Sequence, residues 1–432
     1  MILDLISSET TQIATLAVIG LLVGAFCNYA IYEWRWFWNS ILPVSPWQFF
    51  RRSRYQESAN ENQKLTPASP LDFIPVIGWF LKSRDSKIFG AGFWMRPLLI
   101  EVAFAVGLPL FFIWQRDGGL LGFSGQHSAT TEAWFWGHTI LIVLMTIATF
   151  IDFDEKTIPD KVTISGTLIA LVIATLLPGF RLPEQLGPGI WQSITFCSPD
   201  EIPGGYWHHD FYGLLVAAGI LTVWCFALLP FTWKLDGSVY DKIRFALGSV
   251  IRPPRKTKCK VGRDVTRGPR LVTWFLCGLW IALMIYIAIA WYLLSKDVYW
   301  NSLFGAVVGL GVGGGLVWSV RIVAGWAMQR EAMGFGDVTL MAMIGAFLGW
   351  QAAVLTFFLA PVGGMLITLV QFIATRRSEL AFGPYLCGTA FLLLFFWSSL
   401  WPPAATGFFF VGGKWLAITL VAVLVAMALM LA

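Results

Sequence analysis

The sequence predicts an all-α polytopic membrane protein with about eleven transmembrane helices, and three observations support this fold class. The chain is 57% hydrophobic and only 13% charged, and its mean hydropathy is +0.69, which excludes a soluble globular domain. Its 23 Trp and 35 Phe residues suit the aromatic belts at the two membrane surfaces. Apolar stretches of roughly 17–25 residues, each long enough to cross a bilayer, recur along the whole chain.

These stretches define the expected spans one by one. We expect them near residues 13–32, 97–115, 136–152, 162–178, 212–231, 271–294, 303–325, 338–350, 352–374, 384–400 and 413–431. The two helices within 338–374 are separated at Gly349-Trp350-Gln351, which is typical of a tight turn. The glycine-rich run 309–315 lies deep in a span, so we interpret it as a close helix-packing surface and not as a phosphate loop.

The distribution of Lys and Arg predicts the orientation of the spans. Basic residues are concentrated in 33–96, 232–270 and 376–377, and are sparse in 116–135, 179–211, 295–302 and 401–412. Because cytoplasmic loops are enriched in Lys and Arg, we expect the basic segments inside and the N-terminus outside. The acidic N-terminal segment lacks a basic region, so it is predicted to be a translocated tail and not a cleaved signal peptide. The expected location is the inner (cytoplasmic) membrane.

Three features that could indicate other ligands have simpler explanations. The basic loop 232–270 is typical of a topology determinant that touches anionic lipid, so we predict no nucleic-acid partner. The six Cys residues form no C-x-x-C pair, and therefore indicate neither a zinc ribbon nor a disulfide framework. His208-His209-Asp210 could suggest a metal, but it lies in a segment expected on the outer side. We predict no metal site.

Asp152 is the first candidate catalytic residue. It ends a predicted span that carries no other charge, and Pro159 stops the helix beyond it, so that 153–160 form a short polar reversal. Solvation readily accounts for the other charged residues of this segment, Asp154, Glu155, Asp160 and Lys161. Acids at membrane depth are costly and are functional candidates by default. The alternative role for Asp152 is an interfacial cap or a partner for Lys156.

Asp337 is the second candidate, in the segment Gly334-Phe335-Gly336-Asp337. Glu331 precedes this segment, and a predicted span begins immediately after it. Glycines on both sides allow backbone or an extended substrate to approach closely. The alternative is an ordinary glycine-rich helix N-terminus with an Asp cap.

Together the two acids predict a specific chemistry. The expected topology places Asp152 and Asp337 at the cytoplasmic ends of their helices, where they can meet. Two close carboxylates cannot both ionise cheaply, so the pair would share a proton and titrate as a unit. The ionised member can activate water while the protonated member polarises a carbonyl, as in an aspartic protease.

These segments resemble the type IV prepilin peptidase family, the bifunctional leader peptidases and N-methyltransferases of aspartic peptidase family A24. In that family one Asp opens an I-D-x-D…P-D segment and another ends a G-x-G-D segment; here they are Asp152 and Asp337. Further similarities occur in family order. They are residues 24–32, Pro75-Val76-Ile77-Gly78-Trp79, Arg96 with Glu101, 331–337, 345–351 and Phe382-Gly383-Pro384.

The resemblance implies a fold, an activity and partners. It implies a GxGD-type aspartic protease bundle that cleaves the basic leader of prepilin-like or pseudopilin precursors at the cytoplasmic membrane face, for type IV pili or type II secretion. Gly334, Gly336, Pro159, Asp160 and Glu331 would support the active site. Proteolysis would need no cofactor. Methylation of the new N-terminus would use S-adenosylmethionine, with Asn28, Arg96 and Glu101 as candidate residues by motif position.

The resemblance also implies domain boundaries, which follow from the places where the sequence matches the family pattern and where it departs from it. Residues 1–135 form an N-terminal domain without the family's CxxC pairs, which weakens the methyltransferase prediction. Residues 136–178 and 303–400 form the two halves of the peptidase core, 179–302 an insertion with two extra spans, and 401–432 an extra helix.

Three alternative functions are considered. The first is a related GxGD intramembrane protease such as the preflagellin peptidases, against which the first-span motif and the Arg96/Glu101 pair argue. The second is a transporter with buried acids, which would place them near the midplane. The third is an inactive scaffold, against which the presence of both aspartates argues.

Overall fold

The computed structural model shows a helical membrane protein. The structure describes residues 9–34, 71, 74–85, 92–120, 128–187, 190–198, 207–229, 268–295, 297–328, 333–375, 382–403 and 405. Its long helices are α1 (Glu9–Glu33), α5 (Met95–Arg116), α6 (Ser128–Glu155), α7 (Asp160–Leu176), α8 (Phe211–Ala227), α10 (Gly268–Leu294), α11 (Val298–Met328), α12 (Phe335–Leu348), α13 (Trp350–Thr375) and α14 (Gly383–Pro403). Its short elements are α3 (Ile77–Lys82), η3 (Ser83–Asp85), β1 (Pro183–Gly187), β2 (Ile190–Ser193) and η4 (Trp207–His209).

The predicted membrane fold is confirmed. Among the described residues, six helices have the length and apolar composition to cross a membrane, namely α1, α5, α6, α10, α11 and α14. The helices α8 and α12 and the first part of α13 are apolar but shorter. A helix overlaps each predicted span except 413–431, which lies outside the described residues. The division near Gly349 is also confirmed, since Gly349 ends α12 with a φ of 93°.

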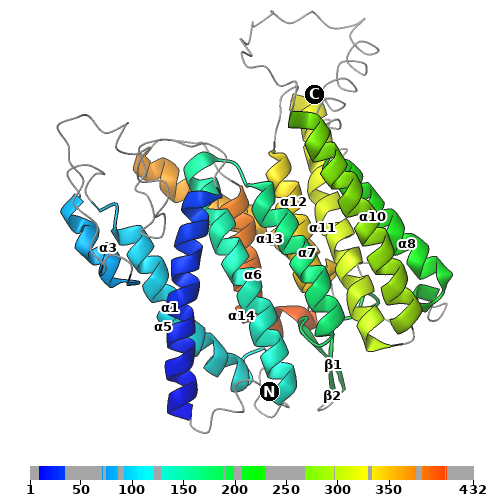
Figure 1. Cartoon of the computed structure of the whole chain (residues 1–432), viewed down its shortest axis with the longest axis horizontal. Coiled ribbons are helices and arrows are strands. Elements are labelled where there is room, and N and C mark those ends of the chain that lie inside the picture. Colours follow the sequence, from blue (N-terminus) through cyan, green and yellow to red (C-terminus); the bar gives the residue numbers. More distant parts are fainter. Residues whose placement is uncertain are drawn as a thin grey trace, which may run out of the picture.

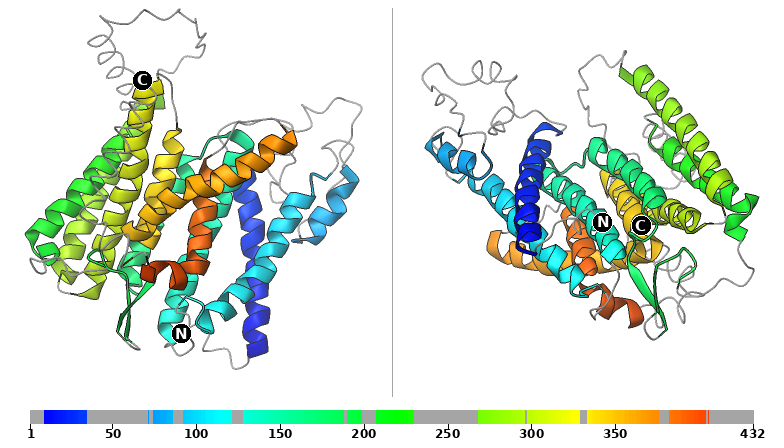
Figure 2. Two further views of the ribbon diagram at one scale, coloured as in Figure 1. Left: turned by 180° about the vertical axis from the view of Figure 1, so that it is seen from behind. Right: turned by 60° about the horizontal axis from the view of Figure 1, so that its bottom comes forward.

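The helices form a central group with one pair on each side. α1 packs along α5, and both contact α6. The centre consists of α6, α7, α11, α12, α13 and α14, and α12 contacts α6, α7, α11, α13 and α14. α8 and α10 pack together against α11, on the opposite side of the molecule from α1 and α5 (Figures 1 and 2). This arrangement puts α12, which carries Asp337, at the centre, where its side chains are almost all buried.

Glycines bring the backbones of α11 and α12 into direct contact. A Cβ atom added to Gly309 would collide with the carbonyl oxygen of Gly345, and one added to Gly345 would collide with that of Gly309. Small residues are the usual means of close helix approach in membranes. The predicted packing role of the glycine-rich run is therefore confirmed at Gly309.

We expect Gly309→Ala to destabilise the protein by about 1–3 kcal/mol, the usual cost of overpacking. The matched control is Gly315→Ala in the same helix, because a Cβ at Gly315 meets nothing within 4 Å. Thermal unfolding in detergent should show a lowered midpoint for the first variant alone. Equal midpoints for both variants would contradict this packing assignment.

The stretch between α7 and α8 contains a β-hairpin that the sequence analysis did not predict. β1 and β2 pair antiparallel, with Pro183 opposite Ser193. Side chains of α13 and α14 donate hydrogen bonds to backbone carbonyl oxygens of this segment and hold it against the core. Gln351 Nε2 donates to the carbonyl oxygen of Thr195 at 2.7 Å, and Trp397 Nε1 donates to that of Pro183, also at 2.7 Å. The hairpin therefore closes the end of the core that is remote from the α6–α7 turn (Figure 1).

His208 and His209 also have structural partners. His208 Nε2 lies 2.6 Å from Asn301 Oδ1, and His209 Nδ1 contacts the carbonyl oxygen of Ser295. Burial, and secondarily the neighbouring His209, lower the pKa of His208. The hydrogen bond from His208 to Asn301 therefore connects η4 to the start of α11.

Candidate active site

Asp152 lies in the last turn of α6, and its side chain is only 4% exposed. The helix ends at Glu155, Lys156 has a φ of 54°, and Pro159 is the N-cap of α7. The predicted reversal after Asp152 is therefore confirmed but is shorter than expected, because residues 153–155 still belong to α6 and Asp160 already belongs to α7. The turn aims α7 back along α6 and leaves the Asp152 carboxyl facing the centre of the bundle.

Asp337 lies in the first turn of α12, three residues after the N-cap Gly334, and is 8% exposed. The backbone N–H of Gly334 donates a hydrogen bond to its carboxyl group. An acidic side chain at this third position commonly reaches back to the N-cap amide, and it is stabilised by the helix dipole. Asp337 is therefore fixed by local backbone geometry, although it is not the N-cap itself.

The structure brings the two candidate aspartates together. The charge of Asp152 acts on the Asp337 carboxyl, and both act on the buried thiol of Cys387 in α14. The α6–α7 turn also approaches the G-x-G-D segment directly. A Cβ added to Gly336 would lie 2.9 Å from Ile158 Cβ and 3.1 Å from its carbonyl oxygen. Gly336 thus permits the close approach of α12 to the turn after Asp152.

The start of α14 provides a third wall of the site. The backbone N–H of Gly383 donates to Asp152 Oδ2 at 3.1 Å. A Cβ at Gly383 would lie 2.6 Å from the same oxygen and 2.8 Å from Ile158 Cδ1. The sequence analysis matched Phe382-Gly383-Pro384 to the family but gave it no role, and it missed Cys387. The F-G-P motif was the available signal for this wall.

Arg96 binds a neighbour of Asp152 instead of either candidate aspartate. Its guanidinium makes two hydrogen bonds to the Asp154 carboxylate, of 2.7 and 2.9 Å, and lies 5.4 Å from the ring centre of Phe150. The Asp154 side chain is 17% exposed, so it is an ion-pair partner rather than a freely solvated acid. This pair joins the start of α5 to the end of α6.

Asn28 and Glu101 form a separate buried cluster, and each is 1% exposed. Glu101 Oε1 accepts hydrogen bonds from Asn28 Nδ2 at 3.0 Å and Trp79 Nε1 at 2.9 Å. Its other oxygen accepts from the backbone N–H of Val76, whose φ of 66° is unusual for a β-branched residue. The carboxylate thus holds the strained Pro75–Trp79 turn against α1 and α5. Of the three residues grouped by motif position, the structure joins two and places Arg96 elsewhere.

The remaining predicted residues take different positions. Pro159 and Asp160 are the N-cap and first residue of α7, so both shape the turn beside the aspartates. Gly334 is exposed, and a Cβ there would meet nothing closer than Asp337 Oδ2 at 3.6 Å. Glu331 lies outside the described residues. Among those that are described, no group of three or more His, Cys, Asp or Glu side chains could hold a metal ion.

Comparison with known proteins shows that the Asp337 half of this site is similar to a known family. Residues 271–369 match the model of the Type IV leader peptidase family. This part of the chain is similar to the type IV leader peptidases. The matched range begins within α10, covers α11 and α12 with the G-x-G-D segment, ends within α13, and excludes Asp152. No solved structure matches the chain.

Curated relatives are similar over a stretch of comparable length. The prepilin leader peptidase/N-methyltransferase of Escherichia coli K12 is 35% identical over 88 residues, which are 20% of this chain and 37% of that protein. The protein of the same name from Stutzerimonas stutzeri is 38% identical over 90 residues, 20% and 29% of the two chains. That from Pseudomonas aeruginosa is 35% identical over 98 residues, 22% and 32%. The chain therefore spans about a third of the length of these relatives.

Proposed function

We propose that this protein is a membrane aspartic peptidase that removes the leader of type IV prepilin-like or pseudopilin precursors. The observation that carries the proposal is the meeting of two buried aspartates, Asp152 and Asp337, from segments that are far apart in the chain. Their helices belong to different halves of the predicted core. The names of the relatives support this function over the transporter and scaffold alternatives.

In the proposed mechanism the pair shares one proton. The ionised carboxylate takes a proton from water as the water attacks the scissile carbonyl, and the protonated carboxyl stabilises the developing oxyanion. When the tetrahedral intermediate collapses and the C–N bond breaks, the first carboxyl returns its proton to the leaving amine nitrogen, so the pair again holds one proton. The Gly383 N–H orients the Asp152 carboxyl, and the Gly334 N–H orients that of Asp337. Each acid is thus held by a backbone donor at a helix start, which keeps the pair in position without a further side chain.

We propose that this site faces the cytoplasm. The apolar helices and the relatives fit a multi-pass protein of the inner membrane. The ion pair between Arg96 and Asp154 puts the start of α5 at the same end as Asp152. The basic stretch 33–96 leads directly into α5, so the expected cytoplasmic enrichment of Lys and Arg places this end inside and the N-terminus outside.

Methylation of the product is a separate prediction. The relatives are named as N-methyltransferases, which would use S-adenosylmethionine. Asn28 and Glu101 do not fit direct binding of that molecule, because both are buried, the Asn28 amide N–H groups donate to Pro97 and Glu101, and both Glu101 oxygens accept hydrogen bonds from this cluster. Their geometry supports a structural role, and no methyl-transfer step is assigned to them.

A cleavage assay tests the proposed function. The protein would be co-expressed with a prepilin from its own genome, leader removal followed by gel shift, and the mature N-terminus read by mass spectrometry. We expect cleavage at the leader junction. A methyl mass increment on the product would establish the second activity, and its absence would restrict the protein to proteolysis. A folded protein that leaves the precursor intact would overturn the peptidase proposal.

A further inference from the structure

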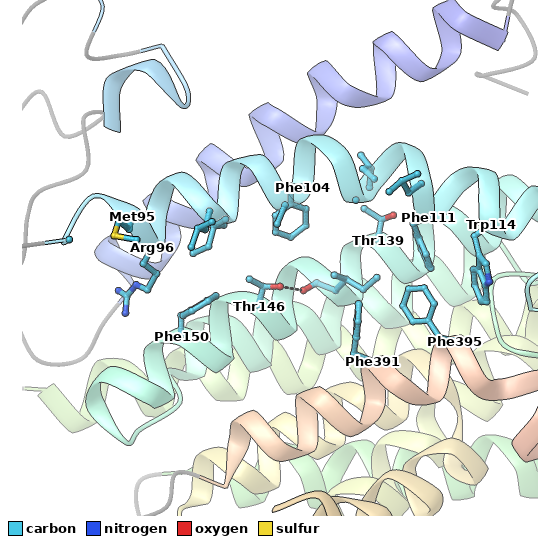
Figure 3. A pocket seen from close by; sticks show the side chains of 18 residues that line it. Met95, Arg96, Phe104, Phe111, Trp114, Thr139, Thr146, Phe150, Phe391 and Phe395 are labelled. Carbon is cyan, nitrogen blue, oxygen red and sulfur yellow. Dashed lines mark hydrogen bonds between the residues drawn. The ribbon is translucent and has the colours of Figure 1, made fainter. Parts of the chain in front are cut away.

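A long apolar groove lies between α5, α6 and α14, outside the pair of aspartates. Its volume is about 890 Å³. Figure 3 shows aromatic side chains along it, from Phe150 near one end through Phe104 and Phe391 to Phe395 and Trp114 at the other. Arg96 is the one charged residue in its lining among the described residues, and it is already paired with Asp154. The lining therefore suits an apolar occupant.

The length of the groove indicates the kind of occupant. Its lining runs along α5 from Met95 to Trp114, which corresponds to about 28 Å of helix at 1.5 Å per residue. A bilayer has a hydrocarbon thickness of about 30 Å, and a lipid chain covers only one leaflet, about half of that. An occupant that matches the groove from end to end is therefore a membrane-spanning helix and not a single acyl chain.

The groove is continuous with the candidate active site. Gly383, Cys387, Phe391 and Phe395 follow one another at four-residue spacing on α14, so they form one slowly rotating stripe. The first two face the aspartates, and the last two line the groove. A helix lying against Phe391 and Phe395 would thus have its end next to Asp152.

We propose that this groove receives the apolar membrane helix of the substrate precursor, and that α14 guides the segment before that helix to Asp152 and Asp337. This inference rests on the proposed peptidase function and adds the docking surface. The Arg96–Asp154 pair marks the point where the bound chain leaves the groove.

Gly107 offers a direct test because it lines the groove and a Cβ there meets nothing within 4 Å. Gly107→Phe should fill the groove without disturbing the fold. The matched control is Gly278→Phe in α10, where a Cβ also meets nothing within 4 Å and the groove is distant. With full-length enzyme and precursor in lipid nanodiscs, we expect kcat/KM to fall about tenfold or more for Gly107→Phe, mainly through KM, and to be unchanged for Gly278→Phe.

The outcomes separate this inference from the proposed function. Failure of the wild-type protein to cleave would count against the peptidase function itself. Cleavage by the wild type with an unchanged KM for a folded Gly107→Phe variant would overturn the groove assignment alone. An equal loss in Gly278→Phe would also overturn it, because the effect would then not depend on the groove.

Photo-crosslinking gives an independent readout. A benzoylphenylalanine at Leu110, which lines the groove and is 59% exposed, should form an adduct with the apolar helix of the precursor. The comparison position is Val216, which is 40% exposed and lines a smaller groove of about 470 Å³ between α8, α11 and α12. Adducts at Leu110 with lipid only, or precursor adducts at Val216 only, would overturn the proposal.

Discussion

Replacing either Asp152 or Asp337 with Asn is expected to reduce precursor cleavage by roughly 10²–10⁴-fold, the usual contribution of a positioned acid or base. Asn keeps the shape of each side chain but can neither accept the proton of water nor supply one. Asp152 is 4% exposed and Asp337 is 8% exposed. A neutral amide at either position adds no buried charge. The folded protein should therefore persist while its activity is lost. Initial cleavage rates in membranes would measure the effect.

The double variant distinguishes a catalytic pair from two separate contributions. Groups that act as a unit show strongly non-additive losses, so Asp152→Asn/Asp337→Asn should be little worse than either single variant. Asp117→Asn is a suitable control, because Asp117 is exposed and lies just after α5, at the other end of that helix from Arg96. Normal cleavage by either single variant would remove that residue from the proposed mechanism.

The second large effect is expected for Gly383→Ala, which should reduce cleavage by about 10²-fold, the cost of a displacement of roughly 1 Å in an active site. The new methyl group would lie 2.6 Å from Asp152 Oδ2 and 2.8 Å from Ile158 Cδ1. Either α14 or the Asp152 carboxyl must move, and the hydrogen bond from the Gly383 N–H lengthens. Cleavage rates of detergent-purified variants would show the loss.

The matched control for this prediction lies in the same helix. Gly388→Ala adds the same methyl group to α14, where it meets nothing within 4 Å. It should leave activity and thermal midpoint unchanged, and a small gain in helix propensity is expected from the loss of a glycine. Equal activity of the two variants would show that the start of α14 does not position Asp152.

Much of the fold could be predicted because each span is a local property of the chain. An apolar stretch of sufficient length must satisfy its backbone hydrogen bonds as a helix, so the positions of the long described helices follow from composition and from breakers such as Pro159 and Gly349. The β-hairpin at 183–193 could not be predicted in this way. It is short, and its attachment depends on donors from Gln351 and Trp397, more than 150 residues away.

The candidate site was predictable in part for the same reason. Asp152 and Asp337 stand out because an acid beside an apolar span is costly wherever the span goes. The F-G-P motif marks Gly383 but not its role, since the Gly383 amide gains a partner only when α14 meets α6. Grouping by motif position was likewise insufficient for Arg96 and Glu101. Five residues apart on α5, they point to different partners, Asp154 and the Asn28–Trp79 cluster.

The sequence by itself determined that this protein is a bundle of membrane helices with an acid at each of two helix ends, because hydrophobicity, charge and helix breakers act over short distances. Only the tertiary structure decided which surfaces meet. Close contact at Gly336 and Gly383 sets how near α12 and α14 come to the turn after Asp152, and close contact at Gly309 sets how near α11 comes to α12. This close packing brings the Asp152 and Asp337 carboxyl groups near enough to interact electrostatically, and it leaves the apolar groove beside them. It arises from contacts between residues that are far apart in the chain.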